Sequence, residues 1–240
     1  MKVTNYTVPT ALNRSYSFAL LADMHSRIPQ GILMTLTALM PDFIVLAGDI
    51  VDGGFQKEPQ MLSFLAGAAM VAPTYYATGN HELFSDTDRE LVASVGVTLL
   101  EDTASVYDEI HIAGLASGFG HSKAFRKTPP PNLSFLQKFS AYEGYKLLIS
   151  HHPEHYPRYI KDQAIDLTVS GHAHGGQWRI ANRGIFAPGQ GLFPKYTSGL
   201  HTNKDSHLII SRGVGGHTVI PRIFNAPEIV MVHLDSHKET

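Results

Sequence analysis

The sequence predicts a single α/β domain that spans residues 1–240. At this length the chain can bury one substantial core, and its hydrophobic and charged fractions of 43% and 17% are those of an ordinary globular protein. Short apolar runs of strand length alternate with segments of helix length. Five of the apolar runs end in Asp, Asn or His, which indicates a site at one edge of a sheet.

The first part of the chain alternates strands and helices. Residues 32–40 are expected to form a helix that Pro41 closes, and Pro59 lies in the first turn of a helix expected at 58–70. A shorter helix is expected at 86–94. The apolar runs between these helices are expected strands: 17–22, 43–47, 74–78 and 97–100.

The second part begins with two short expected strands, 105–107 and 111–115, which turn at Asp108 and Glu109. A loop rich in Gly, Lys and Pro follows, and its residues 118–131 are expected to form one side of an open cleft. Asn132 is expected to cap a helix at 133–139. Further strands are expected at 146–149, 165–169, 178–180, 207–211 and 229–234.

The side chains at the strand ends predict a metal site. Ligands of open α/β sheets bind outside the carboxyl ends of strands. Residues two apart in a strand point to one side, so His172 and His174 can converge on one ion or on two neighbouring ions. The full set offers two carboxylates, four imidazoles and an amide oxygen: Asp23, His25, Asp49, Asn80, His151, His172 and His174.

This donor set is larger than one ion needs, and it suits two ions that share a carboxylate. Paired ions are a known device for phosphoryl displacement, since they grip both the attacking and the leaving oxygen. Mixed nitrogen and oxygen ligands favour Mn, Fe or Zn over Mg or Ca. The chain contains no cysteine, which excludes disulfides and thiolate-bound metals.

Charge and hydropathy exclude other classes of protein. The net charge of −2 gives no electrostatic footprint for nucleic acid and no polybasic patch for a membrane surface. No apolar stretch is long enough to span a bilayer, and residues 1–14 do not resemble a signal peptide. We therefore expect a cytoplasmic protein, with peripheral attachment at the membrane as the alternative.

Five motifs occur in an order that resembles the calcineurin-like metallophosphoesterases. They are Asp23-Met24-His25, Gly48-Asp49-Ile50-Val51-Asp52-Gly53, Gly79-Asn80-His81-Glu82, the strand-end His151, and Gly171-His172-Ala173-His174. Three later pieces resemble a bacterial branch of that family: Gly175-Gly176-Gln177, residues 189–193 and Ser211-Arg212-Gly213. Some members of that branch act on phosphodiesters or on UDP-diacylglucosamine.

The resemblance implies a fold of two mixed β-sheets packed as a sandwich and flanked by helices. It also implies an arrangement of metal ligands. Asp49 would bridge two divalent or trivalent ions of Mn, Fe or Zn. One ion would be held by Asp23, His25 and His174, and the other by Asn80, His151 and His172.

The same resemblance implies the catalytic roles. A metal-bridging hydroxide would attack phosphorus. His81 would face the substrate and protonate the leaving alkoxide, and Asp52 would orient His81 through its second ring nitrogen. The substrate would be a small-molecule or lipid-linked phosphoester. Phosphodiesters are expected over monoesters, because the motif segments contain no Lys or Arg.

Each assignment has a simpler alternative. Asp23 and Asp49 suit helix N-caps, and Asn80 suits a turn. His152 and His155 compete with His151, and Asp52 suits a solvated loop. Glu82 is expected to be structural, and Met24 and Trp178 to lie in the core. Four residues of later loops are further candidates to line the site: His121, Lys123, Arg212 and His217.

Two other functions remain open from the sequence. A metal-binding scaffold or regulatory protein of the same fold would retain the ligands without turnover. A dinuclear hydrolase of non-phosphate esters or amides would use the same metals on another substrate. The presence of His81 favours an active phosphoester hydrolase over the scaffold.

Overall fold

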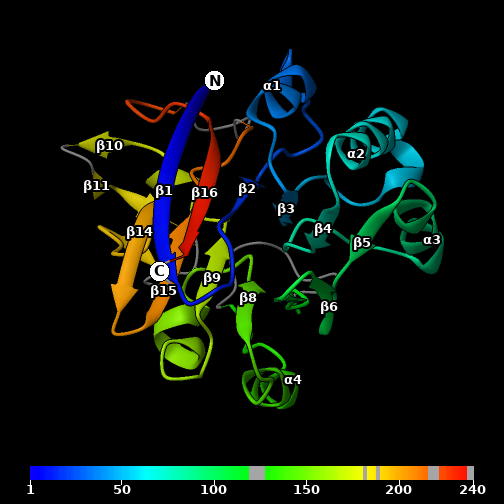
Figure 1. Cartoon of the computed structure of the whole chain (residues 1–240). Coiled ribbons are helices and arrows are strands. Elements are labelled where there is room, and N and C mark those ends of the chain that lie inside the picture. Colours follow the sequence, from blue (N-terminus) through cyan, green and yellow to red (C-terminus); the bar gives the residue numbers. More distant parts are fainter. Residues whose placement is uncertain (119–127, 181–182, 188–189, 216–221, 237–240) are drawn as a thin grey trace.

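Two six-stranded mixed β-sheets form the centre of the molecule (Figure 1). The computed structural model describes residues 1–118, 128–180, 183–187, 190–215 and 222–236. The first sheet has the order β1-β16-β2-β3-β4-β5 and the second β14-β15-β9-β8-β7-β6. This arrangement confirms the two mixed sheets and flanking helices that the sequence resemblance implied.

In the first sheet, only the β16–β2 pair is antiparallel, and every other neighbouring pair is parallel. The carboxyl ends of β2, β3 and β4 therefore meet at one edge. The strand bounds are β1 Lys2–Thr10, β2 Tyr16–Leu21, β3 Phe43–Ala47, β4 Thr74–Ala77, β5 Val97–Leu99 and β16 Glu228–Ser236.

In the second sheet, the central strands β7, β8, β9 and β15 are parallel, and the outer pairs β6–β7 and β14–β15 are antiparallel. The carboxyl ends of β8 and β9 thus also share one edge. The strand bounds are β6 Thr103–Tyr107, β7 Ile110–Gly114, β8 Tyr145–Ile149, β9 Leu167–Ser170, β14 Gly199–Asn203 and β15 Ser206–Ile210.

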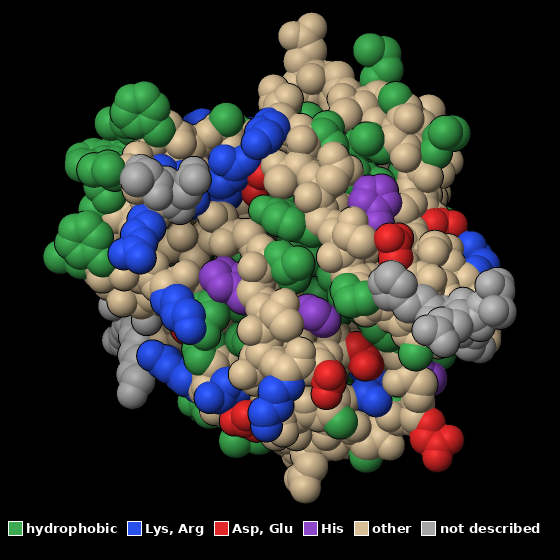
Figure 2. All heavy atoms as spheres, turned by 60° about the vertical axis from the view of Figure 1, so that its left-hand side comes forward, with side chains coloured by type: hydrophobic (Ala, Val, Ile, Leu, Met, Phe, Trp, Pro, Cys, Tyr) green, Lys and Arg blue, Asp and Glu red, His purple; other side chains and the backbone are tan. Residues whose placement is uncertain are grey.

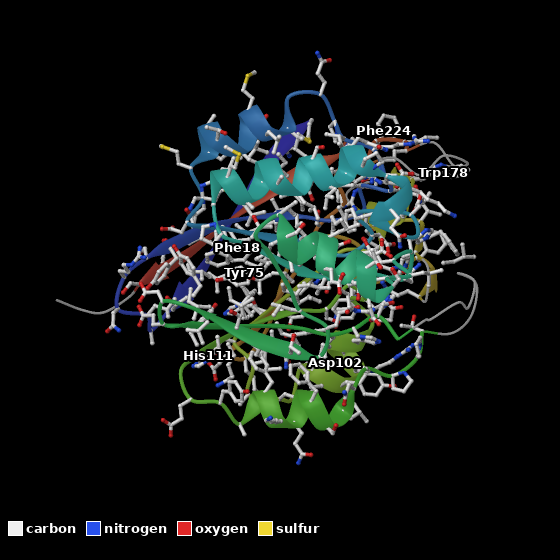
Figure 3. The ribbon with its side chains drawn as sticks, turned by 90° about the vertical axis from the view of Figure 1, so that its right-hand side faces the viewer. Phe18, Tyr75, Asp102, His111, Trp178 and Phe224 are labelled. Atoms are coloured by element: carbon white, nitrogen blue, oxygen red, sulfur yellow. The ribbon has the colours of Figure 1, made fainter. Side chains whose placement is uncertain are left out.

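Helices cover the outer face of each sheet, as Figure 3 shows from the side. The first sheet carries α1 (Ile32–Leu39), α2 (Pro59–Val71) and α3 (Asp86–Ser94). The second sheet carries α4 (Leu133–Ser140) and a π-helical turn, Tyr156–Ile160.

The main core lies between the two sheets. Apolar residues of the first sheet, such as Phe18 and Val45, pack there against residues of the second, such as Ile112 and Leu147. Phe18 and Tyr75 are labelled in this layer in Figure 3. Burial of this apolar surface is the main force that holds the two sheets together.

Local signals explain several element boundaries. Ser85 and Asp88 form a reciprocal capping box at the start of α3. The predicted cap of α4 is confirmed, because the Asn132 side chain accepts a hydrogen bond from the Phe135 amide. Pro59 is the first residue of α2, as expected. No helix in the described part of the chain has the length and apolar character needed to cross a membrane.

Several parts of the chain differ from the sequence expectation, among them the unexpected strand β14 and the π-helical turn Tyr156–Ile160. Residues 2–10 form the edge strand β1, whose side chains are mostly exposed or half-buried, so its sequence resembles a polar tail. Trp178 is 44% exposed rather than in the core. It precedes four two-residue strands outside both sheets: β10 Arg179–Ile180, β11 Arg183–Gly184, β12 Phe186–Ala187 and β13 Gly191–Leu192.

Candidate metal centre

All seven predicted ligands lie where strand ends of both sheets meet. Asp23 and His25 follow β2, Asp49 follows β3 and Asn80 follows β4. His151 follows β8, and His172 and His174 follow β9. Because these five strands run parallel in their sheets, their following loops gather at one edge of the sandwich. The structure brings the two aspartates and four histidines close together, and Asn80 lies on a loop at the same edge.

The backbone turns sharply at these positions. Positive φ angles occur at five of the seven candidates, Asp23, His25, Asp49, His172 and His174, with values between 46° and 66°. Non-glycine residues rarely adopt this left-handed conformation, and it is concentrated at functional sites.

Gly48 shows how closely the two sheets approach at this edge. Its φ is +81°, and an added Cβ would lie 2.5 Å from His151 Nδ1. Any larger residue would push against the imidazole that the second sheet contributes, so a glycine is needed directly before Asp49.

One group of donors consists of Asp23, His25 and His174. The Nε2 atoms of His25 and His174 are 3.3 Å apart, and His174 Nε2 is 3.8 Å from Asp23 Oδ1. All three side chains are buried, and their candidate ligand atoms lie within 4.8 Å of one another. Asp23 also accepts the His172 amide hydrogen, which joins the loops after β2 and β9.

Asp49 lies between this group and a second one. Its Oδ2 atom is 4.0 Å from His25 Nε2 and 3.1 Å from His151 Nε2. Its other oxygen, Oδ1, accepts the backbone amide of His81 at 2.8 Å. The carboxylate thus faces donors from both sheets at the same time.

The second group contains His151, His172 and Asn80. His151 Nδ1 is 2.7 Å from the carbonyl of Ala47, which orients Nε2 toward Asp49. The Asn80 side-chain oxygen is buried and accepts no hydrogen bond from any described residue. Such an atom is costly to bury unless it has a partner, and a cation is a suitable one.

His152 also belongs to this cluster, since it lies with His151 and His172 within ligand distance. Its Nε2 atom is 3.0 Å from the Ser117 hydroxyl. His155 Nε2 is 2.9 Å from the carbonyl of Pro129. Of these three neighbouring histidines, His151 is the one whose ring nitrogen contacts Asp49, at 3.1 Å.

The buried histidines differ in the direction in which their surroundings shift the pKa. Burial lowers the pKa of His151, but the carboxylates of Asp49 and Asp23 raise it to about 10. Burial raises the pKa of Asp49, and the neighbouring His151 outweighs this and brings it well below its usual value. Burial lowers the pKa of His172 to about 3 and also lowers that of His174. The last two imidazoles are therefore neutral, which metal coordination requires.

Asp52 holds two histidines together. Its Oδ1 atom is 2.9 Å from His81 Nδ1 and 2.9 Å from His25 Nδ1. The contact with His81 was expected, and the contact with His25 was not. Asp52 hydrogen bonds raise the pKa of His81. The side chain of His81 is 29% exposed, so it lies on the open side of the cluster.

Glu82 is structural, as the sequence suggested. Its buried carboxylate accepts hydrogen bonds from the amides of Asp49, Ile50, Val51 and Gly79 and from the Tyr76 hydroxyl. These bonds fix the loop after β3 against the loop after β4. Met24 is fully buried, also as expected.

Some residues around the site carried no recognisable signal in the sequence. Arg222 Nη2 is 3.5 Å from His174 Nδ1, and Asn225 donates to the carbonyl of His174. Glu154 Oε1 is 4.0 Å from His172 Nε2. Arg212, which the sequence suggested as a site residue, instead pairs with Glu228. His121, Lys123 and His217 lie outside the described residues.

The residues present fit a divalent metal ion. Imidazoles and buried carboxylates lie within ligand distance of one another, and the Asn80 side-chain oxygen, on the loop after β4, is buried without a hydrogen-bond donor among the described residues. This mixed set of nitrogen and oxygen donors suits transition metals and zinc.

Comparison with known protein families gives a match over most of the chain. The calcineurin-like phosphoesterase family model matches residues 16–176, a range that includes every candidate ligand. Phosphodiesterase YaeI of Escherichia coli (strain K12) is 31% identical over 235 residues, which cover 91% of this chain and 82% of that protein.

Two other relatives are longer than this chain. A metallophosphoesterase of Helicobacter pylori (strain ATCC 700392 / 26695) is 24% identical, and the match covers 93% of this chain but only 60% of that protein. Metallophosphoesterase YkuE of Bacillus subtilis (strain 168) is 26% identical, with 85% of this chain and 72% of that protein covered.

Solved structures share the fold at low sequence identity. The NAD nucleotidase of Haemophilus influenzae superposes with a TM-score of 0.55 at 15% identity, covering 83% of this chain and 45% of that chain. A protein of Thermus thermophilus superposes with a TM-score of 0.51 at 12% identity, covering 82% of this chain and 89% of that chain. These likenesses concern the fold alone.

Proposed function

The chain belongs to the calcineurin-like phosphoesterase family, and from this premise we propose that it is a dinuclear metal-dependent phosphoester hydrolase. The observation that carries the proposal is the position of Asp49, whose Oδ2 atom lies 4.0 Å from His25 Nε2 and 3.1 Å from His151 Nε2. A carboxylate between two sets of donors suits a bridge between two ions.

We assign Asp23, His25 and His174 to one ion and Asn80, His151 and His172 to the other, with Asp49 shared. The all-imidazole and amide character of the second set favours Mn, Fe or Zn. When bound, the paired cations would polarise the phosphoryl group and lower the pKa of coordinated water toward neutrality.

The chain's own residues then position the substrate and its protons. His81 lies on the open side of the cluster, and Asp52 orients its ring through Nδ1. The remaining nitrogen, Nε2, would donate a proton to the leaving alkoxide. His25 is held by the same carboxylate, so Asp52 positions a ligand and a proton donor together.

Phosphodiesters are the proposed substrate class, as small molecules or linked to lipid. The relative YaeI is named as a phosphodiesterase. A diester monoanion also needs fewer cations than a monoester dianion, and Arg222 beside His174 is already hydrogen-bonded to the carbonyls of Arg212 and Gly215. We further propose that residues 1–240 form a single domain and that the protein is cytoplasmic.

The test combines metal analysis with a substrate panel. Purified protein should contain two ions per chain, and chelation followed by addition of Mn²⁺ should restore hydrolysis of bis-(p-nitrophenyl) phosphate. The value of kcat/KM should be higher for this diester than for p-nitrophenyl phosphate. A preference for the monoester would contradict the substrate class. Two bound ions without turnover on any phosphoester would instead support a metal-binding scaffold.

A further inference from the structure

An exposed apolar surface lies beside the candidate metal centre. Among the described residues, fifteen large hydrophobic side chains are exposed, and seven of them lie between residues 178 and 224. Leu192, Phe193 and Phe224 are 71%, 76% and 89% exposed. The surface, called the apolar face below, consists of Trp178, Ile180, Phe186, Leu192, Phe193, Ile223 and Phe224.

Hydrogen bonds between backbone segments show that the parts of the chain that carry the apolar face adjoin one another. Trp178 pairs with Ile223, the Ile185 amide donates to the carbonyl of Trp178, and the Phe193 amide donates to the carbonyl of Ile185. Three successive segments, around residues 178, 185 and 193, therefore lie side by side, and the distant Ile223 joins them. Figure 3 labels Trp178 and Phe224 at the same end of the molecule, and Figure 2 shows several exposed hydrophobic groups in green along one side.

The two most exposed aromatic residues of this face have unusual backbones. Phe193 and Phe224 have φ angles of 50° and 52°. A left-handed conformation is unfavourable for bulky residues, and neither side chain gains core burial in return. Such positions point to a role outside the folding of the chain.

The charge of this region differs from that of the whole protein. The net charge of the chain is −2, but the segment from Gly175 to Asn203 contains no Asp or Glu. It contains Arg179, Arg183 and Lys195, and the last two are exposed. In Figure 2, Lys and Arg side chains in blue lie beside the green groups. The apolar face therefore has a basic border.

Short connections join the apolar face to the metal centre. Trp178 is four residues after His174 in the chain. Asn225, next to Phe224, donates hydrogen bonds to the carbonyls of His174 and Gln177. A surface that binds the apolar face would therefore lie close to the candidate metal centre.

We propose that the apolar face docks the protein peripherally on an anionic lipid bilayer. Protruding aromatic and aliphatic side chains suit the boundary between headgroups and acyl chains, and Arg183 and Lys195 suit anionic headgroups. A second copy of this chain fits less well, because a two-fold contact would bring the basic borders together. The docking itself does not depend on turnover. Only its consequence, presentation of lipid-linked phosphoesters to the site, rests on the proposed function.

The test is sedimentation of the full chain with vesicles. We expect it to sediment with vesicles that contain phosphatidylglycerol and to remain in solution with phosphatidylcholine alone. The double variant Phe193→Asn/Phe224→Asn should lower the partition coefficient at least about tenfold, since it removes two aromatic groups from the lipid boundary. Asn tolerates left-handed backbone, so the variant should fold, which thermal melting checks.

Matched controls separate binding through the apolar face from non-specific binding of exposed hydrophobic side chains to vesicles. Met34→Gln/Met70→Gln removes two hydrophobic side chains that are 77% and 89% exposed on α1 and α2, and it should sediment like the parent. Arg183→Gln/Lys195→Gln should weaken binding several-fold at low salt, with a smaller effect at high salt.

Several results would overturn the proposal. They are no sedimentation with anionic vesicles, equal binding to neutral vesicles, or an equal loss of binding in the methionine control. A concentration-dependent dimer that the Phe193→Asn/Phe224→Asn variant abolishes would assign the surface to a second copy of the chain. Loss of vesicle binding with unchanged hydrolysis of a soluble diester would leave the proposed function intact.

Discussion

The two sheets contribute different chemistry to the edge where they meet. Loops of the first sheet supply the oxygen donors Asp23, Asp49 and Asn80, together with His25. Loops of the second sheet supply imidazoles alone among the candidate ligands: His151, His172 and His174.

The contrast shows how one edge can favour transition metals. Oxygen ligands alone would also suit Mg²⁺ or Ca²⁺, whereas imidazoles suit Zn and the transition metals. The two sets approach each other at Asp49 Oδ2, which is 3.1 Å from His151 Nε2. Asp49 is thus the point at which the two contributions become one site.

The largest effect should follow from Asp49→Asn. One substitution removes a charge that faces donors of both sheets, so both ions should be lost and hydrolysis should fall to the background rate. Elemental analysis and kcat/KM for bis-(p-nitrophenyl) phosphate measure this. The control is Asp86→Asn on the exposed surface of α3, which should change neither value. Two ions per chain in Asp49→Asn would contradict the bridging role.

His81→Ala tests a residue of the first sheet's loops that lies outside the assigned ligand set. Both ions should remain, and kcat should fall by about 10²–10⁴-fold, as expected for loss of a general acid. The fall should be smaller for a nitrophenol leaving group than for an alkoxide. His111→Ala, on β7, is the control. Loss of metal in His81→Ala would show that His81 is a ligand.

Asp52→Asn should have a smaller effect, because it acts through two other residues. Loss of an orienting carboxylate commonly lowers activity or metal affinity about 10–100-fold. If Asp52 acts mainly through His81, the double variant with His81→Ala should be no slower than His81→Ala alone. A further loss of metal in the double variant would instead assign the main effect to His25.

Metal replacement probes the imidazoles of the second sheet directly. After chelation, Mn²⁺ or Zn²⁺ should restore activity at least about tenfold better than Mg²⁺, since Mg²⁺ prefers oxygen ligands. Titration of the metal-free protein with each ion gives the affinities independently of turnover. Equal affinity for Mg²⁺ would mean that the oxygen donors alone determine binding.

The smallest effect concerns a contact that ties the two sheets together. Glu228 on β16 accepts hydrogen bonds from Arg212, which follows β15, and from Thr4 on β1. Burial raises the pKa of Glu228, but these partners outweigh it and lower the pKa below its usual value. Glu228→Gln should therefore reduce the free energy of unfolding by about 1–3 kcal/mol at neutral pH.

The pH dependence provides the check on this last prediction. A carboxylate with a depressed folded-state pKa stabilises the protein above its unfolded-state pKa, and the contribution is lost as the pH falls through the folded value. Denaturant unfolding of both proteins between pH 7 and acid should show the difference shrinking below about pH 4. A constant difference would indicate that Arg212 and Glu228 contribute through packing alone.

The sequence predicted the central strands and the place of the candidate ligands well, because both depend on local patterns. Fully apolar runs such as Phe43–Ala47 are typical of buried strands, and the motifs that follow them carry the candidate ligands. It did not reveal the edge strand β1, whose exposed residues carry no apolar period. Residues such as Arg222 and Glu154 were also missed, because their approach to the site depends on tertiary packing.

The left-handed backbone at five of the candidate ligand positions has a consequence for directed evolution. Each such residue destabilises the fold by about 1 kcal/mol or more relative to glycine, which adopts this conformation freely. A selection for heat resistance alone, without any demand for activity, should therefore enrich Gly and Asn at Asp23, His25, Asp49, His172 and His174. Such an experiment would trace the outline of the candidate site without a substrate.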